Sequence, residues 1–494
     1  MTSFLQAATI TCRMSVEETE TEAECFLCFR LTRRVCTACR VPVCCDDHLG
    51  THRPPGSGKC TKFQVSELSG VGRVLVARET IRAGENILTE RAVVAGPAPG
   101  PGPLCLNCCM PCRPEDVCRR CGWTVCSAEC ETGEWHSVEC PVLSSSPPPP
   151  SPCLAAVLPL RLALLARRGD ALAARLELLM DHMEDLHTRP DFQSKWYRPV
   201  TESLAQTDLT EQEILRGIGI FLTNAANMAP ASGRWIFPTF SFISHSCVSN
   251  SRFFISPRGE VKVTAVVDIP AGEEVTISYC PPGTGNVTRR EKILRLWQFQ
   301  CRCPRCEDSE ELGTWLSAVL CRHCGGAMTA ASSLLTAPFT CRAEDCDKEV
   351  SRNTVLALVN SLAEEVRDTK PPDMVDMISK LESFLHTQHY LIMDLRQRWV
   401  DAIMADKKAK TEAELVRVVE YLQVIMAVNS KIEPGYTVTL GTNLRHLNTA
   451  MLGLARLRLD QQKIDKKEFM MIARKAGENI KIAKKCFENT NEEK

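Results

Sequence analysis

The pattern of apolar and polar positions changes sharply along the chain. Between residues 62 and 95, apolar and polar residues alternate in the short runs FQVSEL, GRVLVA and ENILTERAVVAG, which turn residues separate. Such period-two runs of β-branched residues are typical of short strands. Runs of the same kind return over 235–280. From 352 onward apolar residues recur at helical spacing, which predicts five or six amphipathic helices and a turn at 433–443.

Helical segments are also predicted between the two strand regions. Residues 154–189 have apolar positions at helical spacing with a break near Arg167–Asp170. Thr210 followed by Glu213 is a capping-box pattern, which predicts the start of a helix within 208–228. Residues 289–299 predict a short helix. The fold class expected from this pattern is α+β, with a core of small sheets and an all-helical C-terminal domain.

Composition places the chain among ordinary globular proteins. Its 494 residues allow about three domains, and 44% hydrophobic with 24% charged residues is a typical balance. The 59 basic and 60 acidic residues create no overall field, so direct nucleic-acid binding is not expected. The longest apolar stretch, 154–166, is too short to span a bilayer and contains Arg161. No secretory signal is visible, and we therefore expect a cytoplasmic or nuclear location and no membrane partner.

The chain contains 28 cysteines, many of them in closely spaced pairs. In a reducing compartment such pairs are metal ligands rather than disulfides. The block at 105–140 supplies four ligand pairs, and alternating pairs give two interleaved tetrahedral zinc sites. Because no ligand position is left open, both sites should be structural. The predicted sets are Cys105, Cys108, Cys126 and Cys130 for one ion, and Cys118, Cys121, His136 and Cys140 for the other.

Three further groups have ligand character. The block at 25–60 resembles a cross-braced finger of the MYND, B-box or PHD kind, and its spacing leaves the kind open; two zinc ions are favoured over one. Its ligands are Cys25, Cys28, Cys36, Cys39, Cys44, His48, His52 and Cys60, with Cys44 and His48 completing one site and His52 and Cys60 the other. Cys301, Cys303 and Cys306 supply three ligands, and Cys321, Cys324, Cys341 and Cys346 predict a zinc ribbon. The total is about five or six zinc ions.

Four motifs follow one another in the order typical of one protein family. They are GVGR at 70–73, SFISHSCVSN at 241–250, GEEVTISY at 272–279 and FQCRCPRC at 299–306. With a MYND-like finger at 105–140 between the first two, the chain resembles the SMYD family of SET-domain protein-lysine methyltransferases. The additional N-terminal finger and the ribbon resemble a divergent, arthropod-type member. The glycine motif is not a dinucleotide fingerprint, because a strand follows it.

The resemblance implies S-adenosylmethionine as cofactor and a histone tail or other lysine-containing protein as substrate. Tyr279 corresponds to the catalytic tyrosine, Trp297 to a residue of the lysine channel, and Cys247 to the fourth ligand of the Cys301–Cys306 site. The implied cofactor-binding residues are Gly70, Val71, Gly72, Asn224, Ser244, His245, Tyr279 and Phe299. MYND fingers of the family bind proline-rich peptides.

Two positions depart from the family pattern and leave two hypotheses open. Ser244 stands where the family usually has Asn, and Ser249 stands where it usually has Pro. A serine offers fewer hydrogen-bonding groups than an amide. The first hypothesis is an active methyltransferase, and the alternative is a catalytically weak or inactive scaffold that acts in transcriptional regulation through protein–protein interaction.

The expected domain order follows from these motifs. The predicted segments are an acidic lead-in (1–24), an N-terminal finger (25–60), the first part of the SET region (62–104), the MYND finger (105–140), a Pro-rich linker (141–153), insertion helices and SET core (154–280), the post-SET segment (289–310), a ribbon-like segment (311–350) and a helical C-terminal domain (351–494).

Overall fold

The computed structural model describes residues 16–53, 60–98, 100, 102–145, 153–228, 233–256 and 259–488. It forms two compact units, each made of segments that are distant in sequence. The first unit comprises Met1–Glu79, Ile87–Phe242 and Ile255–Lys262, and the second comprises Thr80–Asn86, Ile243–Phe254 and Val263–Lys494. The mixture of small sheets and helices confirms the predicted α+β class. Residues 1–15 of the predicted lead-in and 146–152 of the predicted linker lie outside the described residues.

The first unit combines two-stranded and three-stranded sheets with short helices. Its strands are β1 (Val16–Glu24), β2 (Leu31–Cys36), β3 (Phe63–Leu68), β4 (Gly72–Ala77), β6 (Val94–Pro97), β7 (Ala226–Met228) and β8 (Gly233–Ile236). Its helices are α1 (Asp46–His52), α2 (Ala128–Glu131), α3 (His136–Leu143), η1 (Leu154–Ala156), α4 (Val157–Ala166), α5 (Ala171–Glu177), α6 (Met183–Leu186), η2 (Gln193–Tyr197), α7 (Arg198–Ser203), α8 (Glu211–Asn224) and η3 (Phe240–Phe242).

The second unit contains short strands followed by long helices. Its strands are β9 (Ser244–His245), β10 (Ser251–Ile255), β12 (Thr276–Ile277), β13 (Val319–Leu320), β14 (Ala327–Ala330), β15 (Phe339–Cys341) and β16 (Glu349–Val350), and β5 (Asn86–Arg91) and β11 (Glu260–Ala265) fall on the division between the units. Its helices are α9 (Asn286–Trp297), α10 (Pro304–Glu307), α11 (Arg352–Asp368), η4 (Pro371–Asp373), α12 (Met374–Leu381), α13 (Tyr390–Ala405), α14 (Glu412–Ile432), α15 (Val438–Asp460) and α16 (Lys466–Phe487).

The acidic segment before the first finger differs from the expected solvated lead-in. Over Val16–Glu24 it forms β1, which pairs antiparallel with β2. Glu18 lies opposite Arg34 in the register, and Glu22 forms an ion pair with Arg33 at 3.5 Å. Opposite charges across an antiparallel pair stabilise it, and a polar ribbon needs no buried face. The acidic composition of this segment gave no sign of a strand, because its charges are paired with the basic side chains of β2.

Two predicted turns and caps have the expected local chemistry. Strands β3 and β4 form a hairpin in which Leu68 pairs with Gly72, so Gly70 and Gly72 lie in and beside the turn. Both adopt positive φ, of 74° and 94°, a conformation that glycine enters without a steric penalty. Thr210 and Glu213 form the predicted capping box at the start of α8, and Asp170 caps α5 at the predicted break. Short-range sequence signals were sufficient here.

The hydrophobic core of the second unit joins the ribbon strands to the C-terminal helices. The four strands β13 to β16 form an antiparallel meander in chain order. Met328 and Phe339 of this sheet belong to the same buried cluster as Leu362, Trp399 and Leu422 of the helices. The sheet and the helices therefore form one core and not two separate modules.

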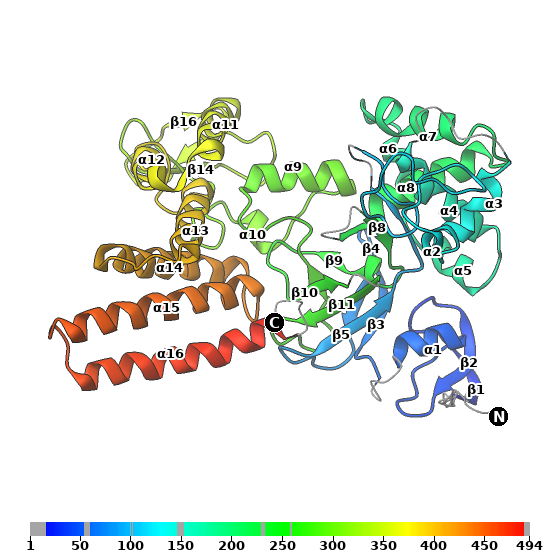
Figure 1. Ribbon diagram of the computed structural model, residues 1–494, viewed down its shortest axis with the longest axis horizontal. Coiled ribbons are helices and arrows are strands. Elements are labelled where there is room, and N and C mark those ends of the chain that lie inside the picture. The colour runs from blue at the N-terminus through cyan, green and yellow to red at the C-terminus, as the bar shows by residue number, and fades with distance from the viewer. Residues whose placement is uncertain are drawn as a thin grey trace. The chain divides into compact units, whose positions relative to one another are not determined.

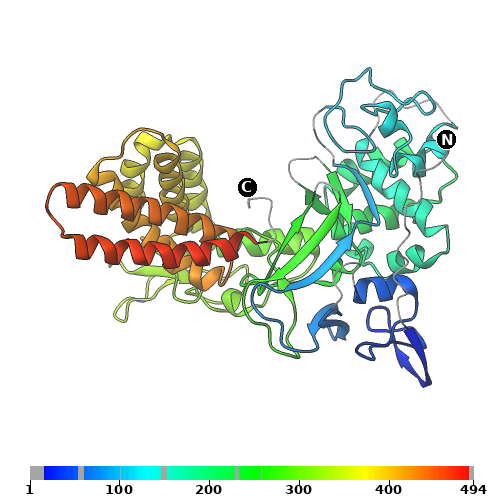
Figure 2. The same ribbon diagram turned by 60° about the horizontal axis from the view of Figure 1, so that its bottom comes forward.

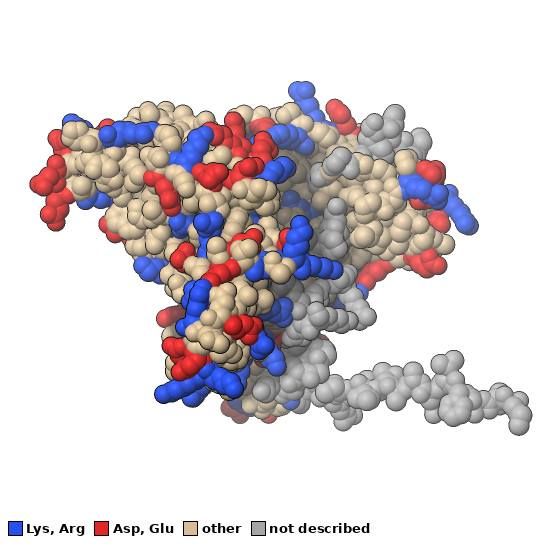
Figure 3. Space-filling model, turned by 60° about the vertical axis from the view of Figure 1, so that its left-hand side comes forward, with Lys and Arg blue, Asp and Glu red and all other residues tan. Residues whose placement is uncertain are grey.

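The long helices form antiparallel pairs. Helices α15 and α16 lie side by side in the views of Figure 1 and Figure 2 and are in contact. The turn predicted at 433–443 is shorter than expected, because α15 already begins at Val438, where Thr437 caps it. On the face of these helices that Figure 3 presents, Lys and Arg are interspersed with Asp and Glu. No helix within the described part of the chain is long and apolar enough to cross a membrane.

The turn between α14 and α15 fits closely against the strand region of the second unit. Gly435 has φ of 84°, and a Cβ atom there would lie 1.9 Å from the carbonyl oxygen of Val266. The amide of Tyr436 donates a hydrogen bond to the same oxygen at 3.0 Å. Arg252 of β10 donates to the carbonyl of Glu488 at 2.8 Å, just after α16. Close backbone approach thus fixes the helical region to this part of its unit.

We expect Gly435→Ala to lower the stability of the protein. The left-handed conformation costs an L-residue about 1–2 kcal/mol, and the new methyl group would also displace the Val266 carbonyl. The measurement is the midpoint of thermal unfolding followed by the helical circular dichroism signal. The matched control is Gly477→Ala at an exposed position of α16, where a Cβ atom would meet nothing within 4 Å. This variant should gain up to about 1 kcal/mol of stability. A Gly435→Ala protein as stable as the control would contradict the packing argument.

Candidate active site and zinc centres

Tyr279 is held at both its backbone and its hydroxyl. Strands β9 and β12 run parallel, with Ser244 opposite Thr276 and His245 opposite Ile277. Two residues past β12, the amide of Tyr279 donates to His245 Nδ1 at 2.9 Å. Its hydroxyl donates to the carbonyl oxygen of Ile243 at 2.7 Å. Burial raises the pKa of Tyr279 above its usual range, so the side chain is a neutral phenol at pH 7.

His245 connects Tyr279 to a cluster of cysteines. Because Nδ1 accepts the amide of Tyr279, the proton of the neutral ring is on Nε2. Nε2 lies 3.2 Å from Cys247 Sγ and can donate to it. Burial lowers the pKa of His245 to about 4, which keeps the ring neutral near pH 7. The His245 ring therefore bridges the backbone of Tyr279 and the sulfur of Cys247, a predicted zinc ligand.

Aromatic rings surround this pair. The ring centroids of Tyr279 and Trp297 are 4.8 Å apart, and those of His245 and Phe299 are 6.3 Å apart. Trp297 ends α9, and Gln298 then takes up a left-handed conformation that directs the chain away from the helix. Phe299 retains 36% of its surface exposed. An exposed ring beside His245 is suited to stacking against a planar ligand.

The two serines that depart from the family pattern lie in different surroundings. Ser244 Oγ donates to Glu274 Oε2 at 2.7 Å, so its hydroxyl proton has a partner within the fold. Ser249 lies beside Asn250, whose side chain donates to the Glu274 carbonyl at 2.7 Å and accepts from the Thr276 amide at 2.8 Å. The loop is therefore fixed by Asn250 without a proline. Glu274 is a partner that sequence analysis missed.

The remaining predicted cofactor residues lie in the first unit. Gly70, Val71 and Gly72 form the hairpin turn between β3 and β4, where Val71 is exposed. Asn224 ends α8, and its side-chain amide donates to the carbonyls of Met180 at 2.7 Å and Ile220 at 3.1 Å. These residues are thus placed within their own unit, whereas Ser244, His245, Tyr279, Trp297 and Phe299 are brought together in the second unit.

Four cysteines of the second unit gather where the family resemblance implied a zinc site. The sulfurs of Cys247, Cys301, Cys303 and Cys306 all lie within 4.8 Å of one another. Cys247 Sγ is 3.5 Å from Cys306 Sγ and 3.9 Å from Cys301 Sγ. A Zn–S bond of about 2.3 Å separates the sulfurs of a tetrahedron by about 3.8 Å. The donor set therefore fits Zn²⁺ in both chemistry and spacing.

A buried arginine lies against this cluster. Arg289 of α9 is fully buried, and its Nε donates to Cys247 Sγ at 2.9 Å. The same guanidinium pairs with Glu311 at 3.2 Å, and Arg305 pairs with Glu311 at 3.0 Å. Burial alone would lower the pKa of Arg289, but the charges of Glu311 and the Cys247 thiolate raise it above its usual range. Arg289 therefore remains a cation that compensates the thiolates.

The block at 105–140 forms the two predicted clusters. Cys105, Cys108, Cys126 and Cys130 make one group of potential ligands, and Cys118, Cys121, His136 and Cys140 make the other, which is buried. Cys108 and Cys126 are 3.6 Å apart, and Cys118 and Cys140 are 3.8 Å apart. Alternating pairs meet in space, so the interleaved arrangement holds.

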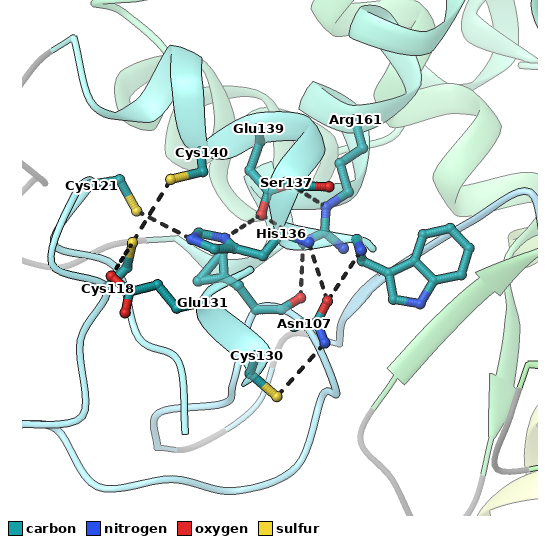
Figure 4. A network of polar contacts seen from close by, with 12 residues as sticks. Asn107, Cys118, Cys121, Cys130, Glu131, His136, Ser137, Glu139, Cys140 and Arg161 are labelled. Atoms are coloured by element: carbon teal, nitrogen blue, oxygen red, sulfur yellow. Dashed lines mark hydrogen bonds and ion pairs between the residues drawn. The ribbon is translucent and has the colours of Figure 1, made fainter. Parts of the chain in front are cut away.

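The second of these clusters is supported by a buried carboxylate and a buried arginine. His136 Nδ1 lies 3.0 Å from Glu139 Oε1, and both residues are fully buried (Figure 4). Arg161 of α4 binds both oxygens of Glu139, at 2.6 and 2.7 Å, and donates to the Leu106 carbonyl at 2.9 Å. A carboxylate on the distal nitrogen orients a ligating histidine and raises its basicity. The ion pair also connects the finger to α4.

The N-terminal finger and the ribbon complete the set. Cys25, Cys28, Cys44 and His48 form one group, and Cys36, Cys39, His52 and Cys60 form another. In the ribbon, Cys321 and Cys346 are 3.9 Å apart and Cys324 and Cys341 are 3.5 Å apart. Each group offers four sulfur or nitrogen donors, the ligands that structural zinc prefers. The zinc-binding chemistry is therefore distributed over both units.

Sequence analysis missed Glu139, Glu274, Arg289 and Glu311. Glu139 did carry a signal, because it stands between two ligands, three residues after His136 and one before Cys140. Arg161 was noted only as a charge within an apolar segment, which is itself the signal for a buried ion pair. Glu274, Arg289 and Glu311 stand in polar sequence, where nothing distinguishes a buried charge from an exposed one.

Comparison with known proteins places this site in a defined class. A family model described as SET domain matches residues 72–280, which include Ser244, His245 and Tyr279. Over these residues the chain is similar to SET domains, and it resembles SMYD-type proteins, including an arthropod member.

Two curated relatives illustrate this resemblance. The chain is 28% identical over 418 residues to the SET domain-containing protein SmydA-8, isoform A, of Drosophila melanogaster, an alignment that covers 79% of this chain and 88% of the relative. It is 28% identical over 193 residues to the protein-lysine N-methyltransferase SMYD4 of Mus musculus, over 35% of this chain and 23% of that relative.

A solved structure is also similar. It is described as the SET domain of LSMT bound to lysine and AdoHcy, with 14% identity, a TM-score of 0.32, and coverage of 81% of this chain and 88% of that one.

We expect Glu139→Gln to weaken metal retention in the finger. The change removes the negative charge that pairs with Arg161 and polarises His136. Loss of one member of a buried ion pair costs about 3–5 kcal/mol, and loss of a carboxylate partner lowers metal affinity about 10- to 100-fold. The measurement is the rate of zinc release to a chromogenic chelator, together with the number of zinc ions that the variant releases faster than wild type.

Glu134→Gln is the matched control for this prediction. Glu134 lies in the same finger but forms an exposed ion pair with Arg91 at 2.6 Å. Its removal should leave zinc release unchanged, because exposed pairs contribute little. Equal release from both variants would show that Glu139 does not support the metal cluster.

Proposed function

We propose that the protein is a protein-lysine N-methyltransferase that uses S-adenosylmethionine. The observation that carries the proposal is Tyr279, which is fixed by His245 and Ile243 and packs against Trp297. It lies within the residues that match the SET domain model. Relatives with assigned activity support it, because SMYD4 of Mus musculus and ASHR1 of Arabidopsis thaliana are named as lysine methyltransferases. The substrate would be a histone or another protein.

The cofactor would supply an electron-poor methyl group on a sulfonium. Its sulfonium would give the methyl group to the lone pair of a lysine amine that has lost one proton to solvent, and would leave as a neutral thioether while the amine became a methylammonium. Such an in-line displacement depends mainly on position. Within the second unit, Ser244, His245 and Phe299 would hold the cofactor.

Tyr279 has the properties that orienting a methyl group requires. Its hydroxyl proton is used by the Ile243 carbonyl, so the oxygen lone pairs are available to accept weak C–H···O contacts. Because its pKa is raised, Tyr279 stays a neutral phenol at pH 7, and its oxygen offers lone pairs without a full negative charge. The π faces of Tyr279 and Trp297 would stabilise a cationic methylammonium and exclude water.

Docking functions follow from the fingers. We propose that the finger at 105–140 binds proline-rich peptide segments, as MYND fingers do, and recruits partners or substrates in the nucleus or cytoplasm. The scaffold alternative would gain support if folded, zinc-loaded protein failed to bind S-adenosylmethionine in a calorimetric titration. Binding with a Kd near 1 μM, about −8 kcal/mol, would support the enzyme.

We expect Tyr279→Phe to reduce methyl transfer by about 100-fold, because the hydroxyl that positions the methyl group is lost. The measurement is transfer of radiolabelled methyl from S-adenosylmethionine to core histones or, failing these, to a lysate protein pool. Folding should be preserved, since the variant loses a single hydrogen bond, of about 1 kcal/mol. Tyr421→Phe, on α14 against Trp399, is the matched control and should keep full activity. Unaltered transfer by Tyr279→Phe would remove Tyr279 from its proposed role.

A further inference from the structure

A pocket of about 480 Å³ lies beside the zinc-binding segment of the second unit. Three elements line it: helix α9, the segment 300–307 that contains Cys301, Cys303 and Cys306, and the ribbon loop between β14 and β15. The lining residues are Arg290, Gln300, Arg302, Glu307, Ser333 and Leu334. None of the predicted cofactor or substrate-channel residues is among them. This pocket therefore has no role in the proposed methyl transfer.

Arg290 is the unusual residue of this pocket. It is only 5% exposed, yet its Nε has no hydrogen-bond partner within the described part of the chain. Among the residues that the structure describes, no carboxylate forms an ion pair with it, whereas Arg289, one position earlier, pairs with Glu311 and donates to Cys247. A buried guanidinium nitrogen without a hydrogen-bond partner is costly. A cation held in this way indicates a site completed by an external anion.

The other lining groups indicate the chemistry of that anion. Arg302 brings a second guanidinium, and Gln300 and Ser333 bring an amide and a hydroxyl that can donate hydrogen bonds. Glu307 contributes one negative charge, so the lining has a net positive charge of one. A phosphoryl group carries about −1.5 to −2 charges and three acceptor oxygens at pH 7. It matches two guanidiniums and two neutral donors better than a carboxylate, which has two oxygens and one charge.

We propose that this pocket binds a phosphorylated side chain of a protein partner. The pocket is larger than a phosphate ion, and Leu334 at its edge is 66% exposed, which suits the flanking residues of a peptide. A nucleic-acid backbone is a poorer match, because it requires a track of basic side chains, whereas this lining holds two arginines and one glutamate. The segment 300–307 carries three cysteines of one predicted zinc cluster, and the ribbon loop leads into β15, which holds Cys341 of another.

The test uses the full-length, zinc-loaded protein and a labelled Gly-Gly-pSer-Gly-Gly peptide. Fluorescence anisotropy should show binding that the unphosphorylated peptide and a Glu peptide fail to reproduce at the same concentration. Arg290→Gln should weaken binding at least about 10-fold, since hydrogen bonds to charged groups contribute about 1.5–3 kcal/mol each. Inorganic phosphate should raise the thermal midpoint of wild type but not of this variant.

Arg295→Gln is the matched control. Arg295 lies on the same helix, is exposed and does not line the pocket. Its loss should change peptide affinity less than twofold. Arg290→Gln should fold at least as well as wild type, because it removes an unpaired buried cation; its intact circular dichroism and zinc content verify this. No binding by wild type, or equal weakening by both variants, would overturn the proposal, and tighter binding of the Glu peptide or of a single-stranded oligonucleotide would overturn the phosphopeptide assignment.

Discussion

The second unit depends on one electrostatic requirement: the negative charge of four largely buried thiolates must be compensated by nearby positive charge. With Zn²⁺ bound, the Cys247, Cys301, Cys303 and Cys306 site would carry two excess negative charges. Arg289 is in direct contact with two of these sulfurs, and Glu311 holds Arg289 beside Arg305. Buried charges persist only when they are paired and hydrogen-bonded. The network therefore fixes α9, the cysteine segment and the loop at Glu311 in one arrangement.

The same requirement explains how Tyr279 is positioned. His245 has no freedom of tautomer, because Tyr279 donates to one nitrogen and a thiolate is near the other. A charged thiolate favours an N–H group as its neighbour, and burial keeps the ring neutral. Loss of the metal would protonate or release Cys247 and would leave His245 with a different partner. Metal binding and the geometry around Tyr279 are consequently one cooperative element rather than two features.

In the finger at 105–140 a ligand is also supported by a buried ion pair, but the anion and the cation follow the ligand in the opposite order. There the ligand is His136, the next group is an anion, Glu139, and the outer group is a cation, Arg161. In the second unit a cation contacts the sulfurs and an anion is outside it. The difference follows from the ligands, because an imidazole donates a proton outward whereas a thiolate accepts one. In the finger the outer group, Arg161, comes from α4, whereas in the second unit the outer group, Glu311, lies in a turn after α10.

Local signals in the sequence predicted much of this arrangement, and the parts it missed depend on distant pairs. Spacing predicted which cysteines share a cluster, the capping box predicted the start of α8, and the glycines predicted the β3–β4 turn. Nothing local distinguishes Arg289, which is buried and paired, from Arg290, which is also buried but whose Nε finds no partner among the residues that the structure describes. The two are adjacent, have the same propensity, and differ only in what folding places opposite them. Arg289 has a carboxylate partner, Glu311, within the same region. Among the described residues Arg290 has no such partner. A bound anion explains this difference better than imperfect packing does.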